Sequence, residues 1–161
     1  MATNKEIKIM KDVNELILNP SNMKKHNERS IKEKMDALAT FGQVHPIVID
    51  KNNIVLSGNG RLIAAKELGW KEIWVTVSDL EGSKAIAYSI ADNKTSESSE
   101  WKFDELGGTL NGIIDNEPNI SLSAMGFEEY EFKPLLNYSS NTNMMAIQMD
   151  LDSEILTEAP I

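Results

Sequence analysis

Apolar and polar residues follow two different periods along the chain, and together these periods predict a mixed α/β fold. Short apolar runs of the kind found in strands lie at residues 6–10, 43–50, 54–56 and 72–77. Apolar residues at the helical spacing lie at residues 28–40, 61–68, 82–93, 103–114 and 128–136. We therefore expect a small mixed sheet with packed helices, followed by C-terminal helices.

Several local features refine this prediction. The run at 6–10 alternates polar and apolar residues, which is typical of a short edge strand, and residues 51–53 form a hairpin turn. The buried face of the helix at 28–40 is predicted to consist of Ile31, Met35, Leu38 and Phe41. The helix at 82–93 is predicted to cover the sheet with Ala85, Ile86 and Ile90.

The most informative stretch is residues 54–69, which indicate a strand, a turn of small residues and a helix that ends at Gly69. Gly58 and Gly60 allow the backbone to approach a ligand closely. The first N–H groups of the helix then have no partner within it, and they attract anions. Arg61 adds a forked cation suited to phosphate or carboxylate oxygens. We call Gly58, Asn59, Gly60 and Arg61 the anion-binding turn.

The same pattern has plainer explanations. Glycine-rich turns between a strand and a helix are common, and Arg61 could simply pair with a nearby glutamate. The turn is not a P-loop, because no Gly-Lys-Ser/Thr follows at the required spacing. It is not a complete dinucleotide fingerprint either, since residues 62–64 lack the third glycine.

Other polar segments could converge on this turn. Gln43 and His45 lie at the entry to a strand, where ligands of α/β proteins often bind. Asp92 and Asn93 offer oxygens of the kind that Mg²⁺ prefers, beside Lys94. Alternatively, Gln43 caps a helix, His45 is a satisfied histidine, and residues 92–94 are an ordinary helix end.

Composition and charge limit the classes of function. The chain has 161 residues, no cysteine and two histidines, so disulfides, a thiol nucleophile and a structural zinc site are not expected. No apolar run is long enough for a membrane span, and we expect a cytoplasmic protein of a bacterial or phage-infected cell. The net charge of −9 argues against a generally basic nucleic-acid-binding surface.

Charge and composition also divide the chain. The N-terminal third is the basic part, and a weak contact with nucleic acid is predicted there through Lys24, Lys25, Arg29 and Lys32. We expect a core at residues 1–98 and a helical extension packed on it at 99–136. The segment 137–161 is acidic and is expected to be a disordered tail, with or without a role as a partner-binding peptide.

The order of these motifs resembles the ParB/sulfiredoxin superfamily over about residues 7–136. It is most similar to the ParB-like N-terminal domains, also called ParB-like nuclease domains, of phages and mobile elements, which often accompany DNA methyltransferases. The residues that carry the resemblance are Leu16, Pro20, Asn22, His26, Gln43, Pro46, Gly58, Arg61, Ala64, Ala65, Leu68, Gly69, Asp92, Asn93 and Trp101.

This resemblance implies a nucleotide site. In ParB proteins the turn that corresponds to residues 58–61 binds the phosphates of a nucleoside triphosphate, typically CTP. The family's Gln-Pro entry corresponds to Gln43 and Pro46. Its segment that helps to hold phosphate and Mg²⁺ corresponds to Asp92 and Asn93. The implied cofactor is Mg²⁺ with CTP or ATP.

The chain departs from the family pattern at three positions. Gly60 and Ser96 stand where ParB proteins have arginines, so fewer cations are available to neutralise a triphosphate. Sulfiredoxins need a cysteine where this chain has Asn59, which excludes sulfinic-acid reductase activity because there is no thiol to react.

Three classes of function follow from these observations. The first is a nucleotide- or phosphate-binding module in a DNA-linked process such as modification, segregation or phage–host defence. The second is a metal-dependent phosphate enzyme, an NTPase, nuclease or small-molecule kinase, with Asp92, Glu97 and His45 as its candidate catalytic groups. The third is an acidic protein-interaction factor that binds a host protein. The expected partners are a nucleotide and DNA or a DNA-modifying or host defence protein, and a homodimer is one option.

Overall fold

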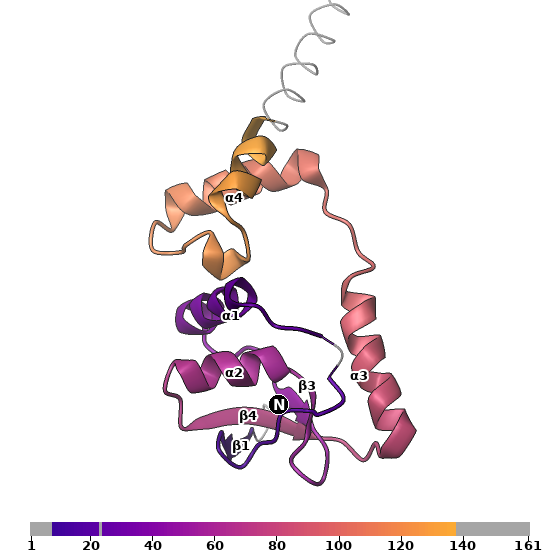
Figure 1. Ribbon diagram of the computed structural model, residues 1–161. Coiled ribbons are helices and arrows are strands. Elements are labelled where there is room, and N and C mark those ends of the chain that lie inside the picture. The colour runs from indigo at the N-terminus through magenta and orange to yellow at the C-terminus, as the bar shows by residue number, and fades with distance from the viewer. Residues whose placement is uncertain (1–7, 23, 138–161) are drawn as a thin grey trace, which may run out of the picture. The chain divides into compact units, whose positions relative to one another are not determined.

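The computed structural model describes residues 8–22 and 24–137 (Figure 1). These residues form two compact units. The first runs to Ser99 and includes Ser123–Gly126, and the second comprises Glu100–Leu122 and the described residues from Phe127 on. The main segment of the first unit ends at Ser99. The predicted division into a core and a helical extension packed on it stays a prediction. The tail predicted at 137–161 lies almost wholly outside the described residues.

The first unit contains a mixed four-stranded sheet in the order β1-β4-β2-β3. The strands are β1 (Ile9–Asp12), β2 (Ile47–Ile49), β3 (Val55–Ser57) and β4 (Glu72–Val77). β1 is antiparallel to β4, β4 is parallel to β2, and β2 is antiparallel to β3. The predicted hairpin and edge strand are both present, and the edge strand lies about three residues later than the pattern indicated.

Two helices cover the sheet in successive layers, as Figure 1 shows. α2 (Asn59–Glu67) packs on β2, and α1 (Glu28–Phe41) packs on α2. Asn27 caps α1 by accepting a hydrogen bond from the N–H of Ser30. Leu38 is the buried residue of α1, whereas Phe41, predicted to be buried, is 50% exposed because the helix ends there and turns away at Gly42.

The third helix, α3 (Gly82–Ser96), packs on β3. Its contact face is formed by Ala85 and Ser89, and the Oγ of Ser89 donates a 2.7 Å hydrogen bond to the carbonyl of Leu56. Ile86 and Ile90 were expected to cover the sheet but are exposed, so this part of the prediction is wrong. A small residue and a hydroxyl bring the helix backbone closer to β3 than two isoleucines would allow.

The core of the first unit lies between the sheet and α2. Its fully buried large side chains are Ile47, Ile49, Val55, Leu62, Ile73 and Val75. Leu62, Ala64 and Ala65 form the buried face of α2, and the two alanines allow close contact with the sheet. This packing holds the N-terminus of α2 at a fixed position beside the end of β3.

The second unit contains α4 (Phe103–Asn116) and a helical stretch at 129–137, and the segment Ser123–Gly126 between them belongs to the first unit. The rings of Trp101 and Phe127 are in tilted contact with centroids 5.9 Å apart. The predicted helices at 103–114 and 128–136 are both present. Within the described part of the chain, no helix is long and apolar enough to cross a bilayer.

Candidate functional site

The anion-binding turn is built by the abrupt change from β3 to α2. Gly58 is the N-cap of α2 with φ +104°, and a Cβ at this position would lie 2.5 Å from Cγ2 of Ile47. Only glycine therefore fits both the backbone angle and the contact with the sheet. Among the described residues no side chain caps α2, so its first N–H groups face the space in front of the helix.

Arg61 is fixed beside this helix end by backbone carbonyls. Its Nη1 donates a 3.0 Å hydrogen bond to the carbonyl of His45 and lies 3.5 Å from that of Pro46. Burial lowers the pKa of Arg61, and the Asp92 carboxylate opposes this effect. In the described part of the chain no carboxylate lies within ion-pair distance of Arg61, so the simple pairing with a glutamate is not observed.

Two further basic side chains lie at the same helix end. A Cβ at Gly60 would lie 2.8 Å from Cε of Lys34 and 2.9 Å from Cε1 of His26, so both side chains pack directly on Gly60. Burial lowers the pKa of Lys34, and the positive charges of Lys24 and Arg61 add to this effect. Nζ of Lys34 donates a 2.8 Å hydrogen bond to Oγ of Ser30.

Opposite these cations, α3 contributes the acidic side of the site. Oγ of Ser57 donates a 2.6 Å hydrogen bond to Oδ2 of Asp92, which ties β3 to α3. Nδ2 of Asn93 donates to the carbonyl of Ser89, so the amide is oriented by its own helix.

These groups surround a hollow of about 170 Å³, which we call the cationic pocket. Its lining residues are Asn22, Lys24, His26, Lys34, Leu56, Ser57, Gly58, Asn59, Gly60, Arg61, Asp92 and Asn93. Asp92 is the single carboxylate in this lining, against Lys24, Lys34 and Arg61. The balance of charge, with the free end of α2, favours an anion.

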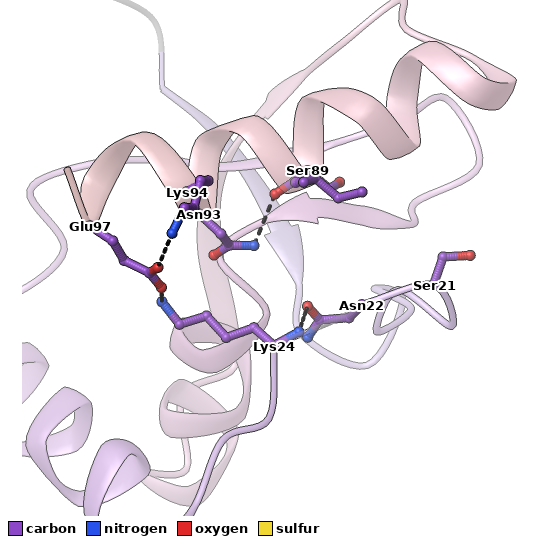
Figure 2. A pocket seen from close by; sticks show the side chains of 8 residues that line it. Ser21, Asn22, Lys24, Ser89, Asn93, Lys94 and Glu97 are labelled. Atoms are coloured by element: carbon purple, nitrogen blue, oxygen red, sulfur yellow. Dashed lines mark hydrogen bonds and ion pairs between the residues drawn. The ribbon is translucent and has the colours of Figure 1, made fainter.

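A second hollow of about 210 Å³, the side pocket, adjoins the first and shares Asn22, Lys24 and Asn93 with it. Figure 2 shows it between α3 and the segment that carries Ser21, Asn22 and Lys24. Glu97 lies at one end of this hollow, 3.5 Å from Nζ of Lys24 and 3.6 Å from Nζ of Lys94. The side pocket therefore has a rim of opposite charges that already pair with each other.

Gln43 and His45 were expected to assist the turn, but their side chains do not line the cationic pocket. The Gln43 amide pairs with the backbone of Trp74, since Oε1 accepts from its N–H at 2.7 Å and Nε2 donates to its carbonyl at 2.8 Å. His45 contributes its carbonyl to Arg61. Gln43 and His45 line another groove, beside Phe41, which shares Lys34 and Arg61 with the cationic pocket. Their side chains therefore lie outside the cationic pocket, and only the backbone carbonyl of His45 contacts Arg61.

Asn59 also has a supporting position. It is only 7% exposed, its Oδ1 accepts the N–H of Asn19 at 2.9 Å, and its Nδ2 donates to the carbonyl of Val55. The side chain thus fixes the preceding loop onto α2. The predicted contribution of residue 59 to anion binding therefore rests on its backbone, not on its amide.

The candidate catalytic groups Asp92, Glu97 and His45 are not brought together. Asp92 lines the cationic pocket, Glu97 lines the side pocket and His45 lines the groove beside Phe41. No cluster of three or more histidine, aspartate or glutamate side chains suited to a metal ion occurs in the described residues. Asp92 and Asn93, predicted to bind Mg²⁺, do lie side by side at the pocket.

The basic residues predicted to touch nucleic acid are divided among different roles. Lys24 lines both hollows, and Lys25 is exposed. Arg29 pairs with Glu33 at 2.6 Å along α1. Lys32 pairs with Asp36 at 2.8 Å and also donates to Oγ of Ser123.

His26 and Lys34 both line the cationic pocket, although neither was predicted from the sequence to bind the ligand. A signal for Lys34 was present. It stands three residues after Ile31 and four before Leu38, on the face of α1 where an apolar residue is expected. A lysine at such a position indicates that the face covers a polar site.

Comparison with known proteins agrees with this architecture. The model of the ParB N-terminal domain family matches residues 2–94, which are more than half of the chain. The protein therefore belongs to this family. The probable chromosome-partitioning protein ParB of Campylobacter jejuni is 28% identical over 88 residues, which are 52% of this chain and 32% of that protein. The match spans about a third of the length of this curated relative.

A solved structure shows the same fold. The C-terminally truncated ParB of Caulobacter crescentus, crystallised with CTP-gamma-S, matches with a TM-score of 0.65 at 16% identity. The match covers 94% of this chain and 87% of that one. The same protein complexed to the centromeric parS site matches at a TM-score of 0.46 and 14% identity, covering 79% and 69% of the two chains. The first of these likenesses confirms the predicted mixed α/β fold of the ParB type.

Proposed function

We propose that this chain is a nucleotide-binding module of the ParB type that holds the phosphates of CTP at residues 58–61. It would act in a DNA-linked process such as segregation, in the cytoplasm. The observation that carries the proposal is the uncapped N-terminus of α2, which faces a pocket where lysine and arginine side chains outnumber carboxylates. The relative solved with CTP-gamma-S has the same fold, which favours CTP as the first nucleotide to test.

The position of Arg61 supports binding rather than surface charge. Its guanidinium is held by two backbone carbonyls and is partly shielded from water, so it needs little reorganisation to meet an anion. Guanidinium also offers two parallel donors to phosphate oxygens. With Gly58 in the αL conformation, the backbone N–H groups of α2 complete a set of donors that converge on one place.

The size of the cationic pocket is also consistent with a phosphate chain. A complete small-molecule site usually encloses about 300–1,000 Å³, and the cationic pocket holds about 170 Å³. We therefore propose that the phosphates bind in the cationic pocket and that the nucleoside extends into an adjoining hollow. The side pocket, which shares three residues with it, is the first candidate.

Mg²⁺ is part of the proposal. Mg²⁺ is commonly held by one or two carboxylates together with phosphates and water. Asp92 provides one carboxylate in the lining of the cationic pocket. Asn93 follows Asp92 in the chain and also lines the pocket, so its side-chain oxygen is the candidate partner for a metal-bound water. We also propose a DNA-linked partner, which is either DNA itself or a DNA-modifying or host defence protein.

The direct test is titration calorimetry of the chain with CTP, ATP and GTP in the presence of Mg²⁺. We expect binding that Arg61→Ala weakens about 10- to 100-fold, since a hydrogen bond to a charged group contributes roughly 1.5–3 kcal/mol. Arg29→Ala is the matched control, because Arg29 is paired with Glu33 and does not line the cationic pocket. The affinity of the Arg29→Ala variant for nucleotide should equal that of the unaltered chain.

Two results would contradict the proposal. One is the absence of binding by any of the three nucleotides. The other is equal binding by the Arg61→Ala and Arg29→Ala variants, which would move the ligand away from α2. A preference for ATP or GTP over CTP would retain the phosphate site and overturn only the choice of nucleotide.

A further inference from the structure

His26 lies at the inner wall of the cationic pocket, on the segment that enters α1. Its ring packs against Gly60, because a Cβ at residue 60 would be 2.9 Å from Cε1 and 3.0 Å from Nδ1 of the imidazole. Gly60 is in the first turn of α2, where the backbone N–H groups are free. The imidazole therefore borders the same space as the donors of the anion-binding turn.

The ring has an unmet hydrogen-bonding requirement. Nδ1 of His26 is shut off from water and has no hydrogen-bond partner among the described residues. Buried polar atoms are nearly always paired, and an unpaired one needs an explanation such as an absent ligand or ion. A bound anion whose oxygens lie at the N–H groups of α2 would place an acceptor beside this ring.

The charges around the ring determine its protonation. Burial lowers the pKa of His26, and the positive charges of Lys34 and Lys24 lower it further. Arg61 and Asp92 face the same pocket from α2 and α3. His26 also lines another hollow, whose lining includes Glu28, Lys32 and Glu67. The environment therefore favours the neutral imidazole while the pocket holds no anion.

We propose that His26 is a ligand-binding residue of the cationic pocket, and that its imidazole takes up a proton from solvent when a phosphate-type anion binds against Gly60. This inference rests on the proposed function, since it describes the same site. The incoming negative charge offsets Lys24 and Lys34, and the protonated ring then donates an N–H to an anion oxygen. No covalent bond forms or breaks, and the proton is the only species exchanged with solvent.

This coupling would make the pocket a sensor of both anion and pH. The histidine is the side chain whose ordinary pKa allows such a change near neutral pH. By linkage, an anion that raises the proton affinity of His26 must itself bind more tightly as the pH falls. Arg61 would bind the anion throughout the physiological pH range, and His26 would adjust the affinity.

The chain offers a matched control, because it has two histidines and only His26 lines the cationic pocket. The experiment uses the full chain, His26→Gln and His45→Gln, and titrates each with CTP and with inorganic pyrophosphate at pH 6, 7 and 8. Calorimetry in two buffers with different ionisation enthalpies gives the number of protons taken up. The Cε1–H resonance of His26 in NMR, followed with and without sodium sulfate, reports the pKa of the ring directly.

We expect the unaltered chain and His45→Gln to take up more protons per bound ligand than His26→Gln, by up to one. From pH 8 to pH 6 their affinity should rise about tenfold more than that of His26→Gln. Sulfate, which does not itself titrate in this range, should raise the pKa of His26. Thermal unfolding of His26→Gln checks that the variant is folded, and the NMR titration of the unaltered chain does not depend on the variant.

The failures of the two proposals can be told apart. If neither CTP, pyrophosphate nor sulfate binds, both the proposed function and the role of His26 are overturned. If these anions bind with equal proton uptake in all three proteins, and the pKa of His26 is unchanged, the nucleotide site stands and the role of His26 is overturned. Binding that Arg61→Ala abolishes and His26→Gln leaves unchanged at pH 6 would likewise overturn the role of His26 alone.

Discussion

Ser57 at the end of β3 and Asp92 on α3 are joined by a 2.6 Å hydrogen bond, in which the hydroxyl donates to the carboxylate. This bond places a negative charge at the edge of a pocket that otherwise collects cations. A carboxylate at an anion site repels the anion unless a cation lies between them. The position of Asp92 therefore favours a ligand that is accompanied by a metal ion, because the cation offsets the repulsion between the carboxylate and the anion.

Asp92→Asn tests that interpretation, because the change removes the charge and keeps the size. Without metal, we expect the variant to bind CTP about fivefold more tightly, since a repulsion on the order of 1 kcal/mol is removed. With Mg²⁺, the unaltered chain should gain affinity and the variant should gain little. Calorimetry in EDTA and in MgCl₂ measures both effects. An equal gain from Mg²⁺ in the two proteins would contradict a metal contact by Asp92.

Gly58→Ala should destabilise the fold. The substitution places a Cβ 2.5 Å from Cγ2 of Ile47 and forces a non-glycine residue to φ +104°. Backbone strain of this kind costs about 1–3 kcal/mol, and the clash with the buried Ile47 adds to it. Urea denaturation measures the loss of unfolding free energy.

Gly69→Ala is the matched control for that change. Gly69 also has a positive φ, +77°, but a Cβ there would meet nothing within 4 Å. Its variant isolates the cost of the backbone angle, and we expect Gly58→Ala to lose more unfolding free energy than Gly69→Ala. Equal losses would show that contact with the sheet is not what requires glycine at residue 58.

Gly60→Ala should separate ligand binding from stability. Residue 60 lies within α2, where alanine is favoured over glycine by up to about 1 kcal/mol. The new Cβ, however, would lie 2.8 Å from Lys34 and 2.9 Å from His26, so both side chains must move into or away from the pocket. We expect CTP affinity to fall about tenfold while the unfolding free energy changes by roughly 1 kcal/mol or less. Unchanged affinity would place the ligand away from these two residues.

Asn59→Ala should loosen the loop at residues 19–22. The substitution removes the acceptor for the N–H of Asn19 in a half-buried hydrogen bond and the donor to the carbonyl of Val55 in a buried one. Leaving these backbone groups unpaired costs about 1–3 kcal/mol. Amide hydrogen exchange should show reduced protection at Asn19, together with a lower midpoint in urea. Retained protection at Asn19 would assign the order of this loop to other contacts.

The stability of the free protein should depend on His26 in slightly acidic solution. The pKa of His26 is lowered by burial from its usual 6.5, so the unfolded chain binds more protons just below that pH. Stability must then rise with pH through this window and fall as the pH drops below it. Urea denaturation between pH 5 and pH 8 should show a weaker pH dependence for His26→Gln than for His45→Gln. Identical profiles would contradict a half-buried, neutral His26.

Much of the site could be predicted from local sequence. The anion-binding turn depends on neighbours in the chain, because the strand, the two glycines and the helix start all lie within residues 54–69. The hairpin and the strand at 72–77 were likewise determined by short-range periodicity and turn residues. The burial predicted for Ile86 and Ile90 was wrong, and the pairing of the Gln43 amide with Trp74 was not foreseen, because both depend on which surface each element meets.

The amino-acid sequence by itself determined the elements of this protein, the glycine-rich helix start and the position of Arg61 within it. These are set by backbone conformation and by the spacing of apolar residues, which act over a few residues. Only the tertiary structure decided that Lys34 and His26 meet at Gly60, that Asp92 faces them, and that the Gln43 amide is taken up by Trp74. Those relationships join residues far apart in the chain, and they depend on the packing of α2 between α1 and the sheet, of α3 on β3 and of β2 beside β4.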